Sequence, residues 1–98
     1  MFVRIIKSYR NLAVFCDENL IGKSFEEGEF KLYVKEDFFK GESVSVERAK
    51  EIMKDMSKED ATFNIVGEES VKAAIDSEII KQEDIKKIQG VSYSMILL

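Results

Sequence analysis

The sequence predicts an α+β fold, a two-layer sandwich in which two helices cover one face of a mixed or mainly antiparallel sheet. Three observations lead to this fold class. Short apolar segments rich in β-branched and aromatic residues lie near both ends of the chain, and two segments between them have helical periodicity. The 98 residues are enough for one hydrophobic core and too few for two. We therefore expect a single domain over residues 1–98.

The first third of the chain is predicted to be mainly β-structure. Residues 2–7 and 12–16 have the composition of strands, and residues 8–11 between them suit a hairpin turn. Residues 30–34 alternate between apolar and polar side chains, which is typical of a strand with one buried face. The intervening residues 17–29 hold two of the five glycines, and we expect them to form a glycine-directed loop.

The middle of the chain predicts two helices. Ser45 is a suitable N-cap for a helix over about 46–57, where apolar residues recur at helical spacing. Residues 61–66 are apolar and short, so a strand and a helix both remain open there. Glu68 and Glu69 then suit the positive end of a second helix. Its expected buried stripe consists of Val71, Ala74 and Ile75.

Two strands are predicted to close the chain, at residues 85–88 and 91–98, joined near Gly90. The last of these is apolar, uncharged and free of proline, and at a sheet edge it would expose unpaired backbone groups. Two arrangements therefore remain open. The strand lies between neighbours inside the sheet of a monomer, or it pairs with a partner or with a second copy in a symmetric homodimer.

The composition removes several kinds of chemistry. The chain has no histidine, so it lacks histidine-based nucleophile pairs, proton shuttles and metal ligands. The lone Cys16 precedes two acids, which disfavour a thiolate, and we expect it to pack as a small hydrophobe. No signal-peptide pattern opens the chain, and no apolar run approaches the roughly 18 residues of a membrane span. We expect a cytoplasmic protein without a membrane partner and assign no catalytic residue, metal or cofactor.

Candidate binding residues gather in the 17–29 loop and in the turn at residues 64–68. Shaped loops on a rigid scaffold are where small domains usually carry function. We expect these two segments to form a docking surface for another protein, which makes the chain a non-enzymatic interaction module. The residues that we assign to this surface are Asp17, Glu18, Gly22, Lys23, Gly28, Glu29, Asn64, Gly67 and Glu68.

An enzyme is the first alternative, with small-ligand or metal-dependent chemistry around Asp17, Glu18, Lys23 and Glu29. It predicts one pocket that encloses these side chains and perturbs the pKa of a carboxylate. The loop itself matches no established motif. A phosphate-binding loop would need a glycine at position 17, and the acids lack the alternating spacing of a calcium loop.

RNA binding is the second alternative. Arg4, Lys7, Tyr9 and Arg10 combine positive charge with an aromatic ring, as in proteins that contact phosphates and stack on bases. The net charge of the whole chain is −4, which repels nucleic acid. RNA is therefore the less favoured partner.

Five short motifs in this order and spacing resemble the archaeal domain-of-unknown-function family numbered four-two-four. They are Cys16-Asp17, Leu20-Ile21-Gly22-Lys23, Glu27-Gly28, Asn64-Ile65-Val66-Gly67-Glu68 and Gly90-Val91. The chain departs from the family pattern near its end, where Ser92-Tyr93-Ser94 replaces Pro-His-Ala. The resemblance implies a small α/β two-layer fold in an archaeal cytoplasm, with no established activity and a partner in the translation apparatus.

Overall fold

A six-stranded mixed sheet forms the centre of the protein, in a computed structural model that describes residues 1–96. The strand order is β5-β1-β2-β6-β8-β7. Strand β2 (Leu12–Cys16) runs antiparallel to β1 (Phe2–Ile6) and parallel to β6 (Thr62–Val66). Strand β8 (Val91–Ile96) lies antiparallel between β6 and β7 (Lys86–Ile88), and β5 (Glu42–Ser43) pairs with β1. The α+β class predicted from the sequence is confirmed.

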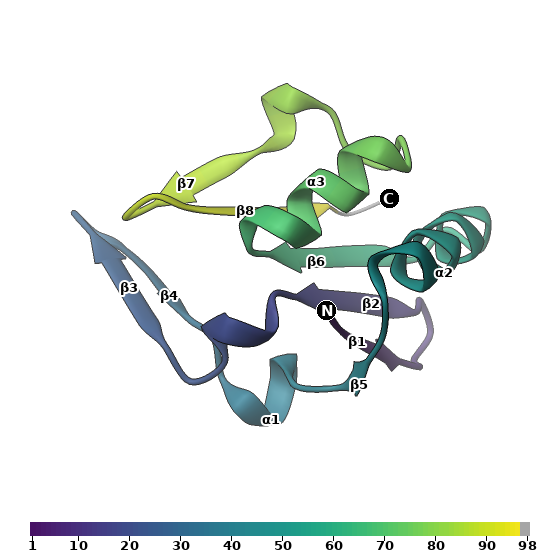
Figure 1. The fold of residues 1–98 in the computed structure, drawn as a ribbon, viewed down its shortest axis with the longest axis horizontal. Coiled ribbons are helices and arrows are strands. Elements are labelled where there is room, and N and C mark those ends of the chain that lie inside the picture. The colour runs from purple at the N-terminus through teal and green to yellow at the C-terminus, as the bar shows by residue number, and fades with distance from the viewer. Residues whose placement is uncertain (97–98) are drawn as a thin grey trace.

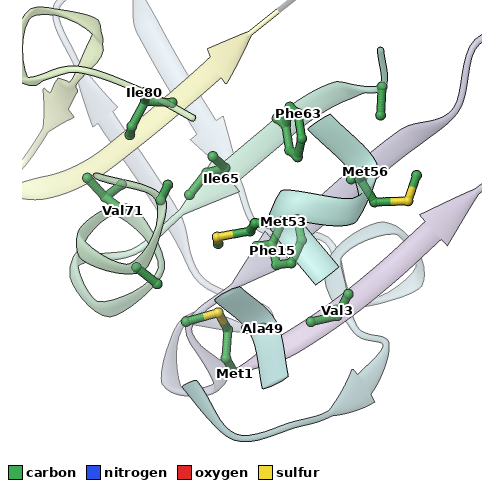
Figure 2. Packing of buried hydrophobic residues seen from close by; sticks show 14 residues of the cluster. Met1, Val3, Phe15, Ala49, Met53, Met56, Phe63, Ile65, Val71 and Ile80 are labelled. Atoms are coloured by element: carbon green, nitrogen blue, oxygen red, sulfur yellow. The ribbon is translucent and has the colours of Figure 1, made fainter. Parts of the chain in front are cut away.

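The two predicted helices cover one face of this sheet, which we call the helix face (Figure 1). Helix α2 (Val46–Lys58) begins as expected, since Ser45 Oγ accepts a hydrogen bond from the Arg48 N–H at 3.1 Å. Helix α3 (Glu68–Asp76) follows β6 directly. Met53 of α2 packs over Phe15 and Phe63 of the sheet, and these three side chains lie at the centre of the larger core (Figure 2).

The ambiguous segment at residues 61–66 is a strand, because β6 pairs with neighbours on both of its edges. Its side chains alternate between the faces. Phe63 and Ile65 belong to the core under the helices, whereas Val66 belongs to a second core on the opposite face. A central strand that is buried on both faces reads as a continuous apolar run, so its periodicity could not separate it from a helix.

The opposite face, which we call the hairpin face, has a cover of its own. Strands β3 (Ser24–Glu27) and β4 (Phe30–Tyr33) form a separate hairpin, followed by the short helix α1 (Glu36–Phe39). In Figure 1 these elements lie on the other side of β2 and β6 from α2 and α3. The expectation of a loop throughout residues 17–29 was therefore wrong, because a 3₁₀ turn occupies Glu18–Leu20 and β3 follows it. The strand escaped notice because Phe25 is its one apolar residue.

A smaller core lies under this cover. It contains Val14, Cys16 and Val66 from the sheet together with Leu32 and Val34 from the hairpin segment. The Arg4 side chain helps to hold α1 in place, because its Nη1 donates to the backbone carbonyls of Asp37 and Phe38. The hairpin face is thus covered at one end by short elements rather than along its whole length by helices.

The final strand lies inside the sheet, between two neighbouring strands, which is the first of the two arrangements predicted for it. β8 pairs with β6 over residues 93–96 and with β7 over residues 91–93. The last two residues of the predicted strand, 97 and 98, lie outside the described part of the chain. Within residues 1–96, no helix has the length and apolar character needed to cross a membrane.

Candidate functional site

Asp17 caps helix α3 from a distant part of the chain. Its Oδ1 accepts hydrogen bonds from the Ser70 N–H at 2.8 Å and the Ser70 hydroxyl at 2.7 Å, and its Oδ2 accepts from the Glu69 N–H at 3.0 Å. A helix leaves these amide groups without partners and presents partial positive charge there. The carboxylate of Asp17 therefore occupies the position that an external anion would need.

We call the contact between Asp17 and helix α3 a joint, and this joint also requires glycine at position 67. Its φ is +111°, and a Cβ on it would lie 2.2 Å from the Asp17 Cγ. Its N–H donates to the carbonyl of Ser92 at 2.8 Å, and the N–H of Asp17 donates to the carbonyl of Val66 at 3.0 Å. Asp17 and Gly67 thus connect β2, β6, β8 and α3, and a structural role accounts for both residues.

Glu18 makes a second joint beside the first. Its Oε2 accepts from the Met1 ammonium at 2.7 Å and from the Ser43 hydroxyl at 2.6 Å. The ammonium also donates to the Val44 carbonyl at 3.2 Å. The hydrogen bond from the ammonium, and then the one from Ser43, lower the pKa of Glu18.

These two joints border a surface depression of about 640 Å³. Four of the residues that we predicted as binding residues come together here, since Asp17, Glu18 and Glu68 line it and Gly67 lies against Asp17. Across residues 1–96, no three His, Cys, Asp or Glu side chains converge in a way that could hold a metal ion. Both carboxylate oxygens of Asp17 and the Oε2 of Glu18 already accept internal hydrogen bonds. The full lining is Met1, Asp17, Glu18, Asn19, Glu68, Glu69 and Lys72.

The remaining predicted residues lie elsewhere. Gly22 is at the base of the β3–β4 hairpin, where its N–H donates to the Val34 carbonyl at 2.8 Å, and the carbonyl of Lys23 accepts from the Val34 N–H at 2.9 Å. Gly28 and Glu29 form the turn at the tip of the hairpin. The single pocket required by the enzyme alternative does not form in the described structure, since neither Lys23 nor Glu29 lines the depression.

Asn64 lies on the opposite face of β6 from Phe63 and Ile65, because side chains alternate along a strand. It lies opposite Val14 on β2 and Met95 on β8, which places it on the hairpin face. The predicted docking surface of residues 17–29 and 64–68 is therefore divided among the cap of α3, the two ends of the hairpin and the sheet itself.

The basic cluster of the RNA alternative is also divided. Arg4 is engaged with carbonyls of α1, whereas Lys7, Tyr9 and Arg10 are exposed at the turn between β1 and β2. Tyr9 and Arg10 line a depression together with Glu59 and Asp60, whose carboxylates would repel phosphate.

Cys16 is fully buried. Burial, and then the neighbouring charge of Asp17, raise the pKa of its thiol to about 12. The thiolate that a nucleophile needs is therefore disfavoured, and Cys16 packs as a small hydrophobe, as expected.

The hairpin face carries an apolar surface that was not predicted from the sequence. Phe30 is 72% exposed and Met95 is 53% exposed, although both are large hydrophobic residues. Phe30 lines a hollow together with Tyr93, and Met95 follows two residues later on the same face of β8. We call Phe30, Tyr93 and Met95 the open strip. The alternation along β8 was visible in the sequence, but its half-covered surroundings were not.

The comparisons with known proteins agree with this fold. The sequence model of a family described as a protein of unknown function (DUF424) matches residues 6–98. The chain belongs to this family. The crystal structure of an uncharacterized conserved protein from Methanopyrus kandleri, an archaeon, is similar to this DUF424 chain with a TM-score of 0.84 and 22% sequence identity, over 97% of this chain and 88% of that one. No curated protein matches.

The resemblance stated from the sequence is therefore confirmed, and the structure gives two of its motif residues a physical role. In this DUF424 protein, Asp17 and Gly67 form the joint that holds α3 to the sheet. Near the end of the chain, Ser92 and Tyr93 occupy positions where we expected proline and histidine. The Ser92 carbonyl accepts from Gly67, and Tyr93 belongs to the open strip.

Proposed function

We propose that this protein is a non-enzymatic module that binds another protein through the open strip. The observation that supports this is the exposure of Phe30 and Met95 beside Tyr93, on a face that its short cover elements leave partly open. Exposed apolar patches bordered by polar residues commonly mark protein contacts. The proposal keeps the expected type of function but moves the docking surface to Phe30, Tyr93 and Met95, which are not among the residues predicted from the sequence.

The chemistry of the remaining surface supports the same choice. The carboxylates of Asp17 and Glu18 are engaged in internal hydrogen bonds, and the thiol of Cys16 is buried. Large apolar side chains such as Phe30 and Tyr93 can supply most of the free energy of a small interface. Phe30 and Tyr93 line one hollow together, which supports the open strip as the docking surface.

Affinity capture from a lysate of the source organism tests this proposal. The baits are the wild-type chain, the double variant F30S/M95S, and Y9S as a control for an exposed aromatic residue elsewhere. The tag belongs after residue 98, because the Met1 ammonium is bonded to Glu18. We expect a partner to be retained by the wild type and by Y9S and lost from F30S/M95S. Equal retention by all three baits would contradict the proposal.

The setting that we propose is the archaeal cytoplasm, with a partner in the translation apparatus. The family resemblance supports this choice and no contact in the structure does. Ribosomal proteins and translation factors are therefore the first proteins to seek among those captured. A partner that depends on the open strip but belongs to another process would support the docking surface and remove the link to translation.

A further inference from the structure

We infer that the segment bound at the open strip carries a large apolar side chain flanked by acidic residues. This inference rests on the proposed function and adds the chemistry of the partner. It comes from one hollow at the end of the strip and from the charges at its rim.

The hollow is built by three elements that are distant in sequence. Phe30 comes from β4, Ile88 from β7 and Tyr93 from β8. Ile88 is only 2% exposed and forms the floor, whereas Phe30 is 72% exposed and forms a wall. The volume is about 340 Å³, near the lower end of the range for ligand pockets. This size suits one large side chain of an extended segment.

Gln89 holds the hollow in shape. Its Oε1 accepts from the Glu26 N–H at 3.0 Å, and its own N–H donates to Glu27 Oε1 at 3.0 Å. These two bonds connect the turn between β7 and β8 to the far end of β3, and so to the hairpin that carries Phe30. A binding surface that is fixed beforehand loses less conformational entropy when a partner binds.

The rim of the hollow carries two lysines and one acid, so its net charge is positive. Lys86 and Lys87 are both exposed and line the hollow, and in residues 1–96 neither forms an ion pair. The acid at the same rim, Glu27, accepts a hydrogen bond from the Gln89 N–H, a neutral group that leaves the formal charge of Glu27 in place. A rim with a net formal charge of +1 next to an apolar hollow, in a chain of net charge −4, complements acidic groups flanking an apolar anchor.

The same lysines have another explanation. β7 is an edge strand, and lysines on edge strands discourage pairing with other chains. That role requires no selectivity for acidic partners. The two explanations therefore differ in whether an acidic peptide binds at the hollow and whether Lys86 and Lys87 decide its affinity.

An NMR titration of the full ¹⁵N-labelled chain separates them. The probe is a blocked synthetic peptide with one phenylalanine between glutamates. One control peptide carries lysines in place of the glutamates, and a second carries serine in place of the phenylalanine. We expect the acidic peptide alone to shift the amide signals of residues 30, 86–88 and 93. The variant K86E/K87E should bind it about tenfold more weakly, since each exposed charge pair contributes up to about 1 kcal/mol. K7E/K54E, with the same net charge, should bind it like the wild type.

Several results would overturn the inference: no shifts at the highest soluble peptide concentration, equal binding of the acidic and basic peptides, or shifts that map elsewhere. Competition by a single-stranded RNA for the same lysines would also overturn it. If capture of a protein partner depends on Phe30 and Met95 but survives K86E/K87E, the module stands and the acidic preference fails. If the acidic peptide binds selectively while F30S/M95S captures the same proteins as the wild type, the proposed function fails and the chemistry of the hollow stands.

Discussion

The two faces of the central sheet are closed to different extents. Among the residues whose burial the structure describes, the helix face buries fourteen under α2 and α3, and its aromatic pair Phe15 and Phe63 stacks with ring centroids 6.3 Å apart. Among the same residues, the hairpin face buries seven under a two-stranded hairpin and a four-residue helix. Long amphipathic helices can cover a whole sheet face, whereas a short hairpin covers only one end of it. The difference leaves Phe30 and Met95 exposed. We expect the helix face to contribute most of the stability, and we propose the hairpin face as the binding surface.

The largest expected effect is on the helix face. Phe15→Ala removes a fully buried ring that packs against Phe63 and Met53. We expect the free energy of unfolding to fall by about 3–5 kcal/mol, the usual cost of deleting a core phenylalanine. Urea unfolding followed by far-UV circular dichroism measures it. A loss below that caused by a change on the hairpin face would reverse the comparison.

Gly67→Ala should have the second-largest effect on stability, because it disrupts the joint that holds α3 on the helix face. The new Cβ would meet the Asp17 carboxyl group at 2.2 Å, on a backbone with φ of +111°. Strain of about 1–3 kcal/mol and the loss of a cap worth about 1 kcal/mol together predict about 2–4 kcal/mol. Asp17→Ala is the control, since it removes the cap without the strain. Equal losses for the two variants would show that the backbone conformation costs nothing.

Leu32→Ala tests the hairpin face. Leu32 is 7% exposed and packs from β4 onto the smaller core. We expect a loss of about 2–3 kcal/mol, at the low end for a buried leucine, because the thin cover can shift to fill the space. Hydrogen exchange should accelerate in β3 and β4 before it does in α2 and α3. Uniform acceleration throughout the chain would show that the two faces unfold together.

The sequence predicted the closed face far better than the open one. Val71 and Ala74 recur at helical spacing and are buried as expected. Strand β3 was missed because its local pattern contains a single apolar residue, and its pairing of Phe25 with Leu32 depends on the following strand. The hydrophobic pattern of a helix or strand shows which of its faces is buried only when the element is long enough for the pattern to repeat.

The candidate site was only partly predictable, because its contacts are not local. Asp17 caps α3 across a separation of 52 residues, so no nearby pattern indicates that its carboxylate is already engaged. The hollow beside Phe30 likewise depends on β7 and β8, which lie far along the chain. The glycines and acids of the 17–29 loop suggested a binding site because they are close together in the sequence. In the structure, residues such as Asp17 instead hold distant elements together.

The smallest expected effect concerns the exposed joint at Glu18, which connects the Met1 ammonium to Ser43 of the edge strand β5. The hydrogen bonds from the ammonium and then from Ser43 lower the pKa of Glu18 below its ordinary value of 4.5. A carboxyl group with a lowered pKa in the folded state adds stability above its unfolded pKa and loses it as the pH falls through the folded one. The wild type should therefore be slightly more stable than Glu18→Gln at neutral pH, and the difference should vanish well below pH 4.5. Urea unfolding of both proteins over a pH series measures this, with Glu68→Gln as a variant of equal charge in the same depression. A difference that persists at low pH would show that the ionised carboxylate is not what stabilises this edge.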